Sequence, residues 1–447
     1  MMRAKASILV ALLWCLALLS LVVVSVLHTA RLDLLIVKHH GDVIQAHYLA
    51  LAGVEKTKAL LYADAKNRNR SRQSHTGDFF NAPQEFSEVA LGRGHFQVLR
   101  RGRSDEGGGI LYGVSDEESR LNVNSATPDE LAKLSGMTPD VAAAILDWRD
   151  EDNAVSPGGA EAEYYLFQRP SSQPRNGMLQ TVRELLMVRG VSPELLFGED
   201  RAQNGLLGDA GAGEESVSRN QAAVLENAGW SALLTVNSAV QNLTAAGEAR
   251  VNVQTADERS LTGVKGLTPE IARAIIAYRG QNEFRSIADL LDVTAARNQN
   301  EAQPGPSQVS GNNASGGPRV VSENLLMDIA DDVTASASAE LPGAVNINSA
   351  SLNVLACLPG LNRELAQAII SHRQSVGFFP NIAWLLKVPG INRDLFKQLA
   401  PLVTARSETY RIISEGRVDS SGARRRIEVI VHVGTSEIET LSYREDL

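Results

Sequence analysis

The segment over residues 147–163 contains several carboxylates whose oxygens could bind a metal ion. Asp147, Asp150 and Asp152 precede a glycine pair, and two glutamates follow it. Carboxylates on a loop that glycines make pliable are the ligands that Ca²⁺ takes in proteins. The alternative is a solvated acidic loop, which is what most acidic runs are. The full candidate set is Asp147, Asp150, Glu151, Asp152, Gly158, Gly159, Ala160, Glu161 and Glu163.

A second segment, residues 198–209, partly matches an EF-hand loop. Asp200, Asn204 and Gly205 stand where such a loop places ligands and its turn. Ala202 occupies the third position of the loop and Gly211 the twelfth, where ligands are needed. We therefore expect no working calcium loop here.

The remaining residues give no sign of an enzyme. The eight histidines show no HExxH spacing, and the adjacent His39 and His40 suit an interface. The sequence contains no GxSxG, P-loop or GxGxxG motif, and Gly107–Gly109 is read as a bare turn. Because we find no nucleophile with a base beside it, we expect a protein without catalytic activity.

The N-terminal region predicts a membrane anchor. Residues 6–27 carry no charge, and as a helix they extend about 33 Å, enough for a hydrocarbon core of about 30 Å. Arg3 and Lys5 favour a cytoplasmic start and an exported remainder. A cleaved signal sequence is the alternative, but its apolar region is usually shorter, about 7–15 residues. The helical pattern continues, so we predict one transmembrane and stem helix over 7–66.

Three stretches of the chain are copies of one another. Residues 122–149, 252–279 and 346–373 align without a gap, each with a glycine 14 positions after its first asparagine. A Ser or Thr is predicted to cap the first helix, and the glycine then turns the chain into a second helix. A related half-copy follows each one, so each unit reads as a pair of helix-hairpin-helix motifs. The caps are Ser125, Thr255 and Ser349, and the glycines are Gly136, Gly266 and Gly360.

These repeats predict the domain boundaries. We expect helical unit 1 at 121–200 with the acidic loop, unit 2 at 250–295 and unit 3 at 345–406. Polar segments at 201–245 and 296–320 are expected to be linkers between the units, the second of them flexible. The middle unit looks like an extra duplication.

Helix-hairpin-helix motifs often bind DNA, but charge argues against that use here. The chain has 43 Lys and Arg against 52 Asp and Glu, a net charge of −9. Residues 121–200 hold six basic and thirteen acidic residues, whereas phosphate contacts need positive charge. A DNA-binding hairpin also carries a second glycine, where this chain has Thr138, Thr268 and Asn362. Only unit 3, with six basic and two acidic residues, is a place to test for DNA binding.

Strand-like segments flank the helical block. Alternating apolar and polar residues predict strands over 80–120 and again over 408–447. They pair into one antiparallel sheet only if the helical block is an insertion between them. The predicted fold class is therefore α+β, with a stem helix, an antiparallel sheet and a large inserted all-α domain.

This plan and several strings resemble the protein K family of the type II secretion system, the large minor pseudopilins. The strings are LHTARLDL after the apolar helix, SDEESRLNVNSA at 115–126, DWRDED…GGAEAEYY at 147–165 and ELLMVRGVSPELL at 184–196. The resemblance covers most of the chain and implies a pilin-like sheet.

It also implies a function. Such a protein is expected to cap the tip of the periplasmic pseudopilus and to help start its assembly for protein export, anchored in the inner membrane with its bulk in the periplasm. The implied partners are the other minor pseudopilins of the tip complex, the major pseudopilin and the prepilin peptidase. Calcium is the implied metal, with Asp147, Asp150, Asp152 and Glu161 as its ligands.

The site at which the peptidase cuts proteins of this family matches this sequence less closely. The junction falls between Ala6 and Ser7, with 1–6 as the leader, although Ala replaces the usual Gly. The fifth residue after it is Ala11, where other pseudopilins carry Glu, and its absence matches K-type subunits. The competing interpretations are a membrane-anchored helix-hairpin-helix DNA-binding protein, with nucleic acid not expected on charge, and a passive anchored scaffold.

Overall fold

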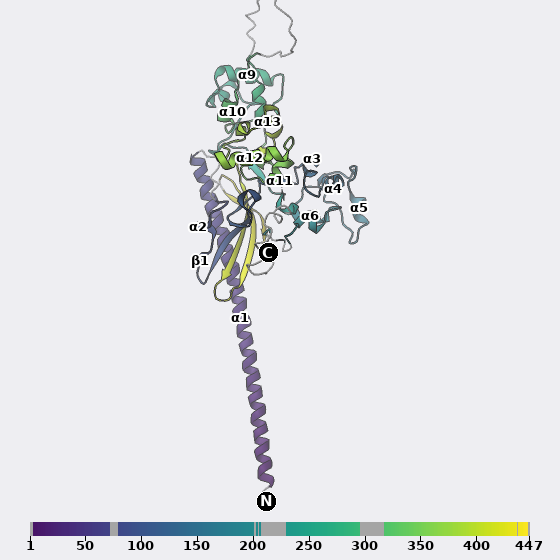
Figure 1. Ribbon diagram of the computed structural model, residues 1–447, viewed down its shortest axis with the longest axis vertical. Helices are drawn as coiled ribbons and strands as arrows, with labels where there is room; N and C mark the ends of the chain where they lie inside the picture. Colours follow the sequence, from purple (N-terminus) through teal and green to yellow (C-terminus); the bar gives the residue numbers. More distant parts are fainter. Residues whose placement is uncertain are drawn as a thin grey trace, which may run out of the picture.

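The computed structural model describes residues 3–71, 79–200, 203, 205–206, 229–295, 317–435 and 437–445. Figure 1 shows a long helix whose upper half lies along a sheet, with helical units beyond the sheet and to its side. The chain is therefore α+β, as the sequence predicts.

The stem is a single helix, α1 (Arg3–Ser71), slightly longer than the predicted 7–66. Its apolar first half is exposed, and an 18-residue window reaches a mean hydropathy of 2.9 with none of it buried. By length and composition this helix is able to cross a membrane. The second half buries one face, beginning at Asp42 and Ala46.

The sheet is built from both ends of the chain. Its order is β1 (Val89–Leu91), β2 (Gly94–Arg101), β13 (Thr409–Val418), β14 (Arg424–Val433) and β15 (Ile438–Arg444), all antiparallel. Two short strands extend it, β3 (Ile110–Tyr112) on β2 and β4 (Ser115–Asp116) on β13. The central pair joins β2 to β13 with Val98 opposite Ser414. The prediction that the helical block interrupts the sheet is confirmed.

The stem covers one face of this sheet. Ala50, Val54 and Leu61 of α1 pack against Ile412 and Val429 in a buried apolar core. Each fully buried side chain of this size stabilises the fold by about 1.5–3 kcal/mol. The approach is so close that a Cβ at Gly416 would lie 2.1 Å from the carbonyl oxygen of Ala46, so only glycine fits there. A short helix, α2 (Pro83–Phe86), adds Phe86 to the core.

All three helical units are closed by the same device, a parallel bridge between a two-residue strand at each end. Unit 1 contains β5 (Leu121–Asn122), α3 (Pro128–Leu131), α4 (Pro139–Arg149), α5 (Ala162–Leu166), η2 (Val182–Met187), α6 (Pro193–Phe197), η4 (Trp230–Ala232) and β6 (Leu234–Thr235). Unit 2 contains β8 (Val251–Asn252), α8 (Glu258–Gly263), α9 (Pro269–Arg279), η5 (Ile287–Asp292), α10 (Glu323–Ile329) and β9 (Val333–Thr334). Unit 3 contains β11 (Val345–Asn346), α11 (Leu352–Cys357), α12 (Arg363–Val376), η6 (Ile382–Lys387), α13 (Arg393–Leu399) and β12 (Val403–Thr404).

These bridges correct two predicted boundaries. Unit 1 does not end at 200, because β6 closes it at Thr235. The described part of the predicted linker 201–245 also contains β7 (Ala239–Gln241), which pairs with β10 (Glu340–Pro342). Unit 2 does not end at 295, because α10 and β9 complete it. The predicted linker 296–320 therefore interrupts the second hairpin of unit 2, where the Val320 amide donates to Val293 at 3.0 Å. Residues 296–316 lie outside the described part of the chain.

The turns inside the hairpins follow the prediction, but the helix caps do not. Gly136, Gly266 and Gly360 all have positive φ, which a residue with a side chain rarely adopts. The first helices are capped two residues later than predicted, at Thr127, Asp257 and Ser351. The residues that replace a second hairpin glycine cap the next helix through their side chains, and they are Thr138, Thr268 and Asn362.

The units are stacked around unit 3. Helix α10 packs on η6 and α13 packs on η5, so units 2 and 3 meet through their second hairpins. Arg393 pairs with Glu323 at 2.7 Å across this contact, and Lys397 pairs with Asp292. Unit 1 meets unit 3 through α3 and α11, where Lys133 donates to the Leu358 carbonyl at 2.6 Å. Unit 2 consequently lies at the end farthest from the N-terminus, and unit 1 projects sideways (Figure 1).

Candidate metal centre and the buried junction

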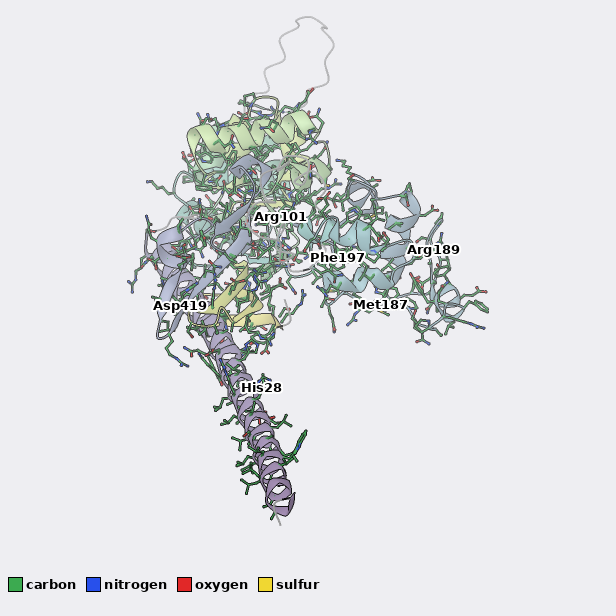
Figure 2. All side chains as sticks on the ribbon, turned by 60° about the horizontal axis from the view of Figure 1, so that its bottom comes forward. His28, Arg101, Met187, Arg189, Phe197 and Asp419 are labelled. Carbon is green, nitrogen blue, oxygen red and sulfur yellow. The ribbon has the colours of Figure 1, made fainter. Side chains whose placement is uncertain are left out.

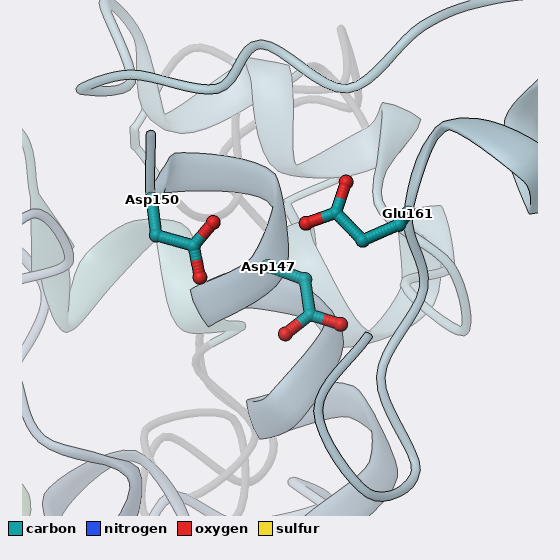
Figure 3. Close-up of side chains that lie close together, drawn as sticks. All are labelled: Asp147, Asp150 and Glu161. Atoms are coloured by element: carbon teal, nitrogen blue, oxygen red, sulfur yellow. The ribbon is translucent and has the colours of Figure 1, made fainter. Parts of the chain in front are cut away.

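The acidic loop of unit 1 folds so that three carboxylates converge. Asp147 and Asp150 lie at the end of α4, and Glu161 is the N-cap residue of α5. One oxygen from each lies within 4.8 Å of the others. Figure 3 shows the carboxylates of Asp150 and Glu161 turned toward one another across the end of α4.

Several of these oxygens are buried without a partner. Glu161 is 2% exposed, and neither of its carboxylate oxygens accepts a hydrogen bond, nor does Oδ1 of Asp150. Burial raises the pKa of Glu161, and the charges of Asp150 and Asp147 raise it further. Burial likewise raises the pKa of Asp150, together with Asp152 and Asp147. Unpaired buried carboxylates are costly, and a divalent cation would remove that cost.

The surrounding loop is shaped to hold this geometry. The Ser156 amide donates to both oxygens of Asp147, at 3.2 and 3.3 Å. A Cβ at Gly159 would lie 2.0 Å from Oδ2 of Asp147, so the loop closes over this carboxylate only with glycine there. Arg189 donates to the Gly159 carbonyl at 2.7 Å and its amide donates to the Tyr165 hydroxyl at 3.2 Å, which ties the loop to α5. The donor set of hard oxygens fits Ca²⁺.

The other predicted site residues lie elsewhere. Asp152 is exposed and outside the cluster, and its Oδ1 accepts from the Ala154 amide at 2.7 Å. Glu151 and Glu163 are exposed. In the EF-hand-like segment, Oδ2 of buried Asp200 accepts from the Gly205 amide at 2.8 Å, while residues 202, 204 and 211 lie outside the described part of the chain. Ala6 and Ser7 lie in the first turns of α1, and cleavage between them stays a prediction.

A second polar centre joins the helical units to the sheet, and sequence reasoning did not assign it. It consists of three buried acids in a row, Asp116, Glu117 and Glu118. Asp116 accepts hydrogen bonds from Asn346 of unit 3 at 3.0 Å, from Ser349 of the same unit, and from Ser407, between unit 3 and β13, at 2.6 Å. We call Asp116–Glu118 and these partners the buried junction.

The pKa values of the two glutamates in the junction are shifted in opposite directions. Glu117 accepts from Arg411 of β13 at 2.7 Å and from Thr235 of unit 1 at 2.5 Å. Burial opposes its charge, but Arg120 and Arg411 outweigh burial and lower its pKa to about 2. Burial and the nearby charge of Asp116 raise the pKa of Glu118 well above its ordinary value. Glu118 accepts from the Thr409 amide at 3.1 Å.

One arginine in each unit was also missed, although the alignment of the repeats contains the signal. Every copy ends in arginine, and its guanidinium donates to two carbonyl oxygens at the start of the same unit. Such bonds from a charged donor fix the loop between the entering strand and the first helix. The pairs are Arg149 to Val123 and Ala126, Arg279 to Val253 and Ala256, and Arg373 to Ile347 and Ala350.

Two protein families match parts of the chain. Residues 116–197, which hold the acidic cluster and begin at the buried junction, match type II secretion system (T2SS), protein K. Residues 247–296 and 343–404 match the helix-hairpin-helix motif. The second match covers most of unit 3 and the start of unit 2, in agreement with the predicted repeats.

Relatives of known sequence match only in part. The endonuclease/exonuclease/phosphatase family domain-containing protein 1 of Rattus norvegicus is 28% identical over 162 residues, 35% of this chain and 28% of that protein. Its Mus musculus counterpart is 26% identical over 194 residues, 42% of this chain and 33% of that protein. The chain thus spans about a third or less of the length of these relatives. An uncharacterised protein of Neisseria meningitidis is 43% identical over 56 residues, 12% of this chain and 7% of that protein.

A solved structure also resembles the chain. It is the crystal structure of the GspK–GspI–GspJ complex from the enterotoxigenic Escherichia coli type 2 secretion system. One of its chains has a TM-score of 0.42 and 12% identity, covering 93% of this chain and 98% of that one. A TM-score of this size does not by itself establish a common fold.

A long helix whose second half lies on an antiparallel sheet, with an inserted helical domain, defines a pilin-like α+β protein. The match of residues 116–197, which begins at the buried junction, points to one family within this class. Residues 116–197 thus resemble protein K of the type II secretion system, the family whose resemblance the sequence suggests.

Proposed function

We propose that this chain is a minor pseudopilin that caps the tip of the periplasmic pseudopilus and helps start its assembly for protein export. The observation that supports this most strongly is the position of the inserted helical block, which lies beyond the sheet at the end farthest from the apolar stem (Figure 1). A subunit stacked above would have to occupy the volume filled by units 2 and 3. The block thus permits subunits below this one and obstructs any above it.

The partners follow from this position. The stem and sheet would pack against other minor pseudopilins of the tip complex and then against the major pseudopilin, through Leu, Val and Ile ridges on α1. GspK, GspI and GspJ form a complex in the solved structure named above, and we propose equivalent partners here. The chain would be anchored in the inner membrane with its bulk in the periplasm, and the prepilin peptidase would cut between Ala6 and Ser7. No step of this function needs a catalytic residue.

Calcium is the proposed cofactor. Asp147, Asp150 and Glu161 would hold it, and its role would be structural, since it would neutralise buried carboxylates and join the end of α4 to the start of α5. Asp152, which lies outside the cluster, would add negative potential and no ligand.

The tip position is tested by labelling. A gold-binding tag on the full chain, in cells that assemble pseudopili, should place one label at one end of each filament. Labels along the filament would contradict the cap. Co-purification with the other minor pseudopilins is expected from membranes, and a stem variant with Ala46→Trp, which blocks the contact with Gly416, should lose it.

The alternative of a membrane-anchored DNA-binding protein is not favoured. The hairpin residues that replace a glycine, such as Thr138, cap helices. The same preparation decides the matter by titration with duplex DNA at low and moderate salt, because binding through phosphates weakens steeply with salt. Salt-sensitive binding at micromolar concentration would overturn the proposed function.

A further inference from the structure

Units 2 and 3 leave a cleft between them, beside the ribbon of β7 and β10 that leads into unit 2 and back out of it. The cleft has a volume of about 250 Å³, and its walls come from the start of η5, the strand that closes unit 2, the start of η6 and the end of unit 3. The described residues of unit 1 contribute nothing to these walls. Figure 2 shows Met187 and Arg189 of that unit to the side of the body. The cleft therefore exists only because the middle unit lies on unit 3.

Three arginines line this cleft. Arg285 precedes η5, Arg250 precedes β8, and Arg406 follows β12. Arg406 is 7% exposed, and its guanidinium donates to the Leu243 carbonyl. The side chain of Arg285 is exposed and makes no hydrogen bond or ion pair with any residue that the structure describes. A cation without a partner in the described part of the chain therefore faces the cleft.

A single carboxylate in the wall compensates these charges. Asp331 is the acid among the described residues that line the cleft. It accepts from the Arg250 guanidinium at 3.0 Å and lies 3.9 Å from the guanidinium of Arg406. Glu408 is also near Arg406, but it lines a different and smaller hollow. Burial and the charge of Arg250 lower the pKa of Arg406 to about 10, so the positive charge there is incompletely compensated.

The rest of the wall is largely apolar. Val240 and Leu341 are paired across the ribbon, and Ile287 of unit 2 lines the cleft together with Ile382 and Val403 of unit 3. Pockets that combine an apolar wall with a few fixed polar groups bind organic ligands. An inorganic anion would leave most of the volume and the apolar surface unfilled. The cleft therefore suits a ligand that carries a negative charge on an apolar body.

Two buried hydroxyl groups indicate what that body is. Thr334 and Thr404 line the cleft and are 7% and 8% exposed. Each hydroxyl oxygen accepts a hydrogen bond from the amide two residues later, at 3.1 and 3.2 Å. Neither hydroxyl donates a hydrogen bond to a residue that the structure describes. Buried donors of this kind need acceptors, and the carbonyl groups of a peptide supply them whereas a hydrocarbon chain does not.

We propose that this cleft binds a short apolar peptide segment of a partner protein through its carboxylate. The carboxylate would pair with Arg285, because guanidinium groups bind carboxylates through two parallel hydrogen bonds. The charges of Arg250 and Arg406 would raise the positive potential in the cleft. The apolar side chains would lie against the ribbon and unit 3. The carboxylate is that of a chain terminus or of an acidic side chain. Binding does not require the proposed tip position, so either can fail without the other.

Fluorescence anisotropy of labelled peptides tests this with the full chain in lipid nanodiscs. The probe is rhodamine-labelled Gly-Ala-Val-Leu with a free carboxylate, and the comparison peptides are its amide and the amide of Gly-Ala-Asp-Leu. We expect the free acid to bind and amidation to weaken binding about tenfold, since charged hydrogen bonds are lost. Tight binding of the amidated aspartate peptide would support the cleft and assign a side-chain carboxylate. Phosphate or octanoate that competes as well as the unlabelled peptide would overturn the inference.

Two variants and a matched control decide the assignment. Arg285→Glu should weaken binding of the free acid by about tenfold or more, and Leu341→Trp should abolish it by filling the cleft from the ribbon. The control is Arg259→Glu on α8, which is exposed and outside the lining, and it should keep the affinity. A cooperative thermal transition like that of the parent chain shows that each variant is folded. An equal loss in the control, or no binding of the free acid up to about 5 mM, would overturn the inference.

Discussion

Units 1 and 3 have the same architecture, but unit 1 carries the carboxylate cluster and unit 3 carries the contacts to the sheet. In both, an asparagine lies in the first strand, an arginine of the second helix donates to the loop at the start of the unit, and a parallel bridge joins the ends of the unit. Between the two hairpins, unit 3 has only residues 377–381, whereas unit 1 has residues 150–181, which complete the carboxylate cluster. Unit 3 instead supplies the side chains that bind Asp116. The residues that correspond between copies build the unit, and those that differ carry the carboxylate cluster or the attachment to the sheet.

The largest effect is expected where unit 3 joins the sheet. Asp116→Ala removes the common acceptor of Asn346, Ser349 and Ser407, and it leaves these donors buried. We expect a loss of about 3–5 kcal/mol in the free energy of unfolding, measured by chemical denaturation in detergent. The corresponding change at an exposed acid, Asp152→Ala, is the control. A loss below about 1 kcal/mol would show that the junction does not hold unit 3.

The two glutamates of the junction should respond to pH in opposite directions. The lowered pKa of Glu117 means that its contribution is present above the ordinary value of 4.5 and is lost as pH falls toward about 2. Glu117→Gln should therefore cost about 3 kcal/mol at neutral pH, since one unit of pKa corresponds to about 1.4 kcal/mol, and much less near pH 2. The raised pKa of Glu118 means that its contribution is present at acid pH and is lost as pH rises.

Glu118→Gln should consequently match the parent chain at acid pH and exceed it at neutral pH. Thermal unfolding of both variants across pH 2–8 measures this. Parallel profiles for the two substitutions would contradict the assigned electrostatics.

Unit 1 alone should depend on metal. Ca²⁺ at about 100 times its dissociation constant should raise the free energy of unfolding by about 2.7 kcal/mol. Asp147→Asn or Glu161→Gln should remove this gain, whereas Asp152→Asn should keep it, because only the first two belong to the cluster. Terbium luminescence excited through Trp148, next to Asp147 in the chain, reports binding directly. Loss of binding in the Asp152 variant would reassign the ligands.

The smallest effect is expected when the repeated arginines of units 2 and 3 are compared. Arg279→Ala removes two bonds to backbone carbonyls, while Arg373→Ala also removes the ion pair with Asp105 at 2.8 Å. The second substitution should cost about 1 kcal/mol more than the first, in thermal unfolding of the full chain. Equal losses would show that the link from unit 3 to the sheet hairpin contributes nothing.

Periodic and repeated features were read correctly from the chain. The stem follows from a helical pattern of period 3.6, the strands within 80–120 and 408–447 follow from a period of 2, and the three hairpin glycines follow from the threefold repeat. Asp147, Asp150 and Glu161 were found because acids and glycines are close in sequence there. The first-helix caps were misplaced by two residues, because a Ser or Thr stands at both candidate positions in some copies, as Ser125 and Thr127 do.

Features that depend on contacts between residues distant in the sequence could not be predicted from such patterns. The ends of unit 2 were misassigned because its closing strand follows a long polar insertion that reads as a linker. Asp152 was grouped with the ligands because it is near them in sequence, yet the turn after α4 carries it outward. Asp116, Glu117 and Glu118 could not be assigned from the sequence, because the side chains and amides that join them to units 1 and 3 and to β13 lie more than 100 residues away.

Local order along the chain was thus enough to establish the long N-terminal helix, the repeated units, the sheet segments and the acidic loop, because each rests on contacts between near neighbours. The fold alone brought β2 beside β13 and placed unit 3 on Asp116. Long-range pairing made those choices, since burial and charge compensation at a junction depend on which distant side chains arrive there.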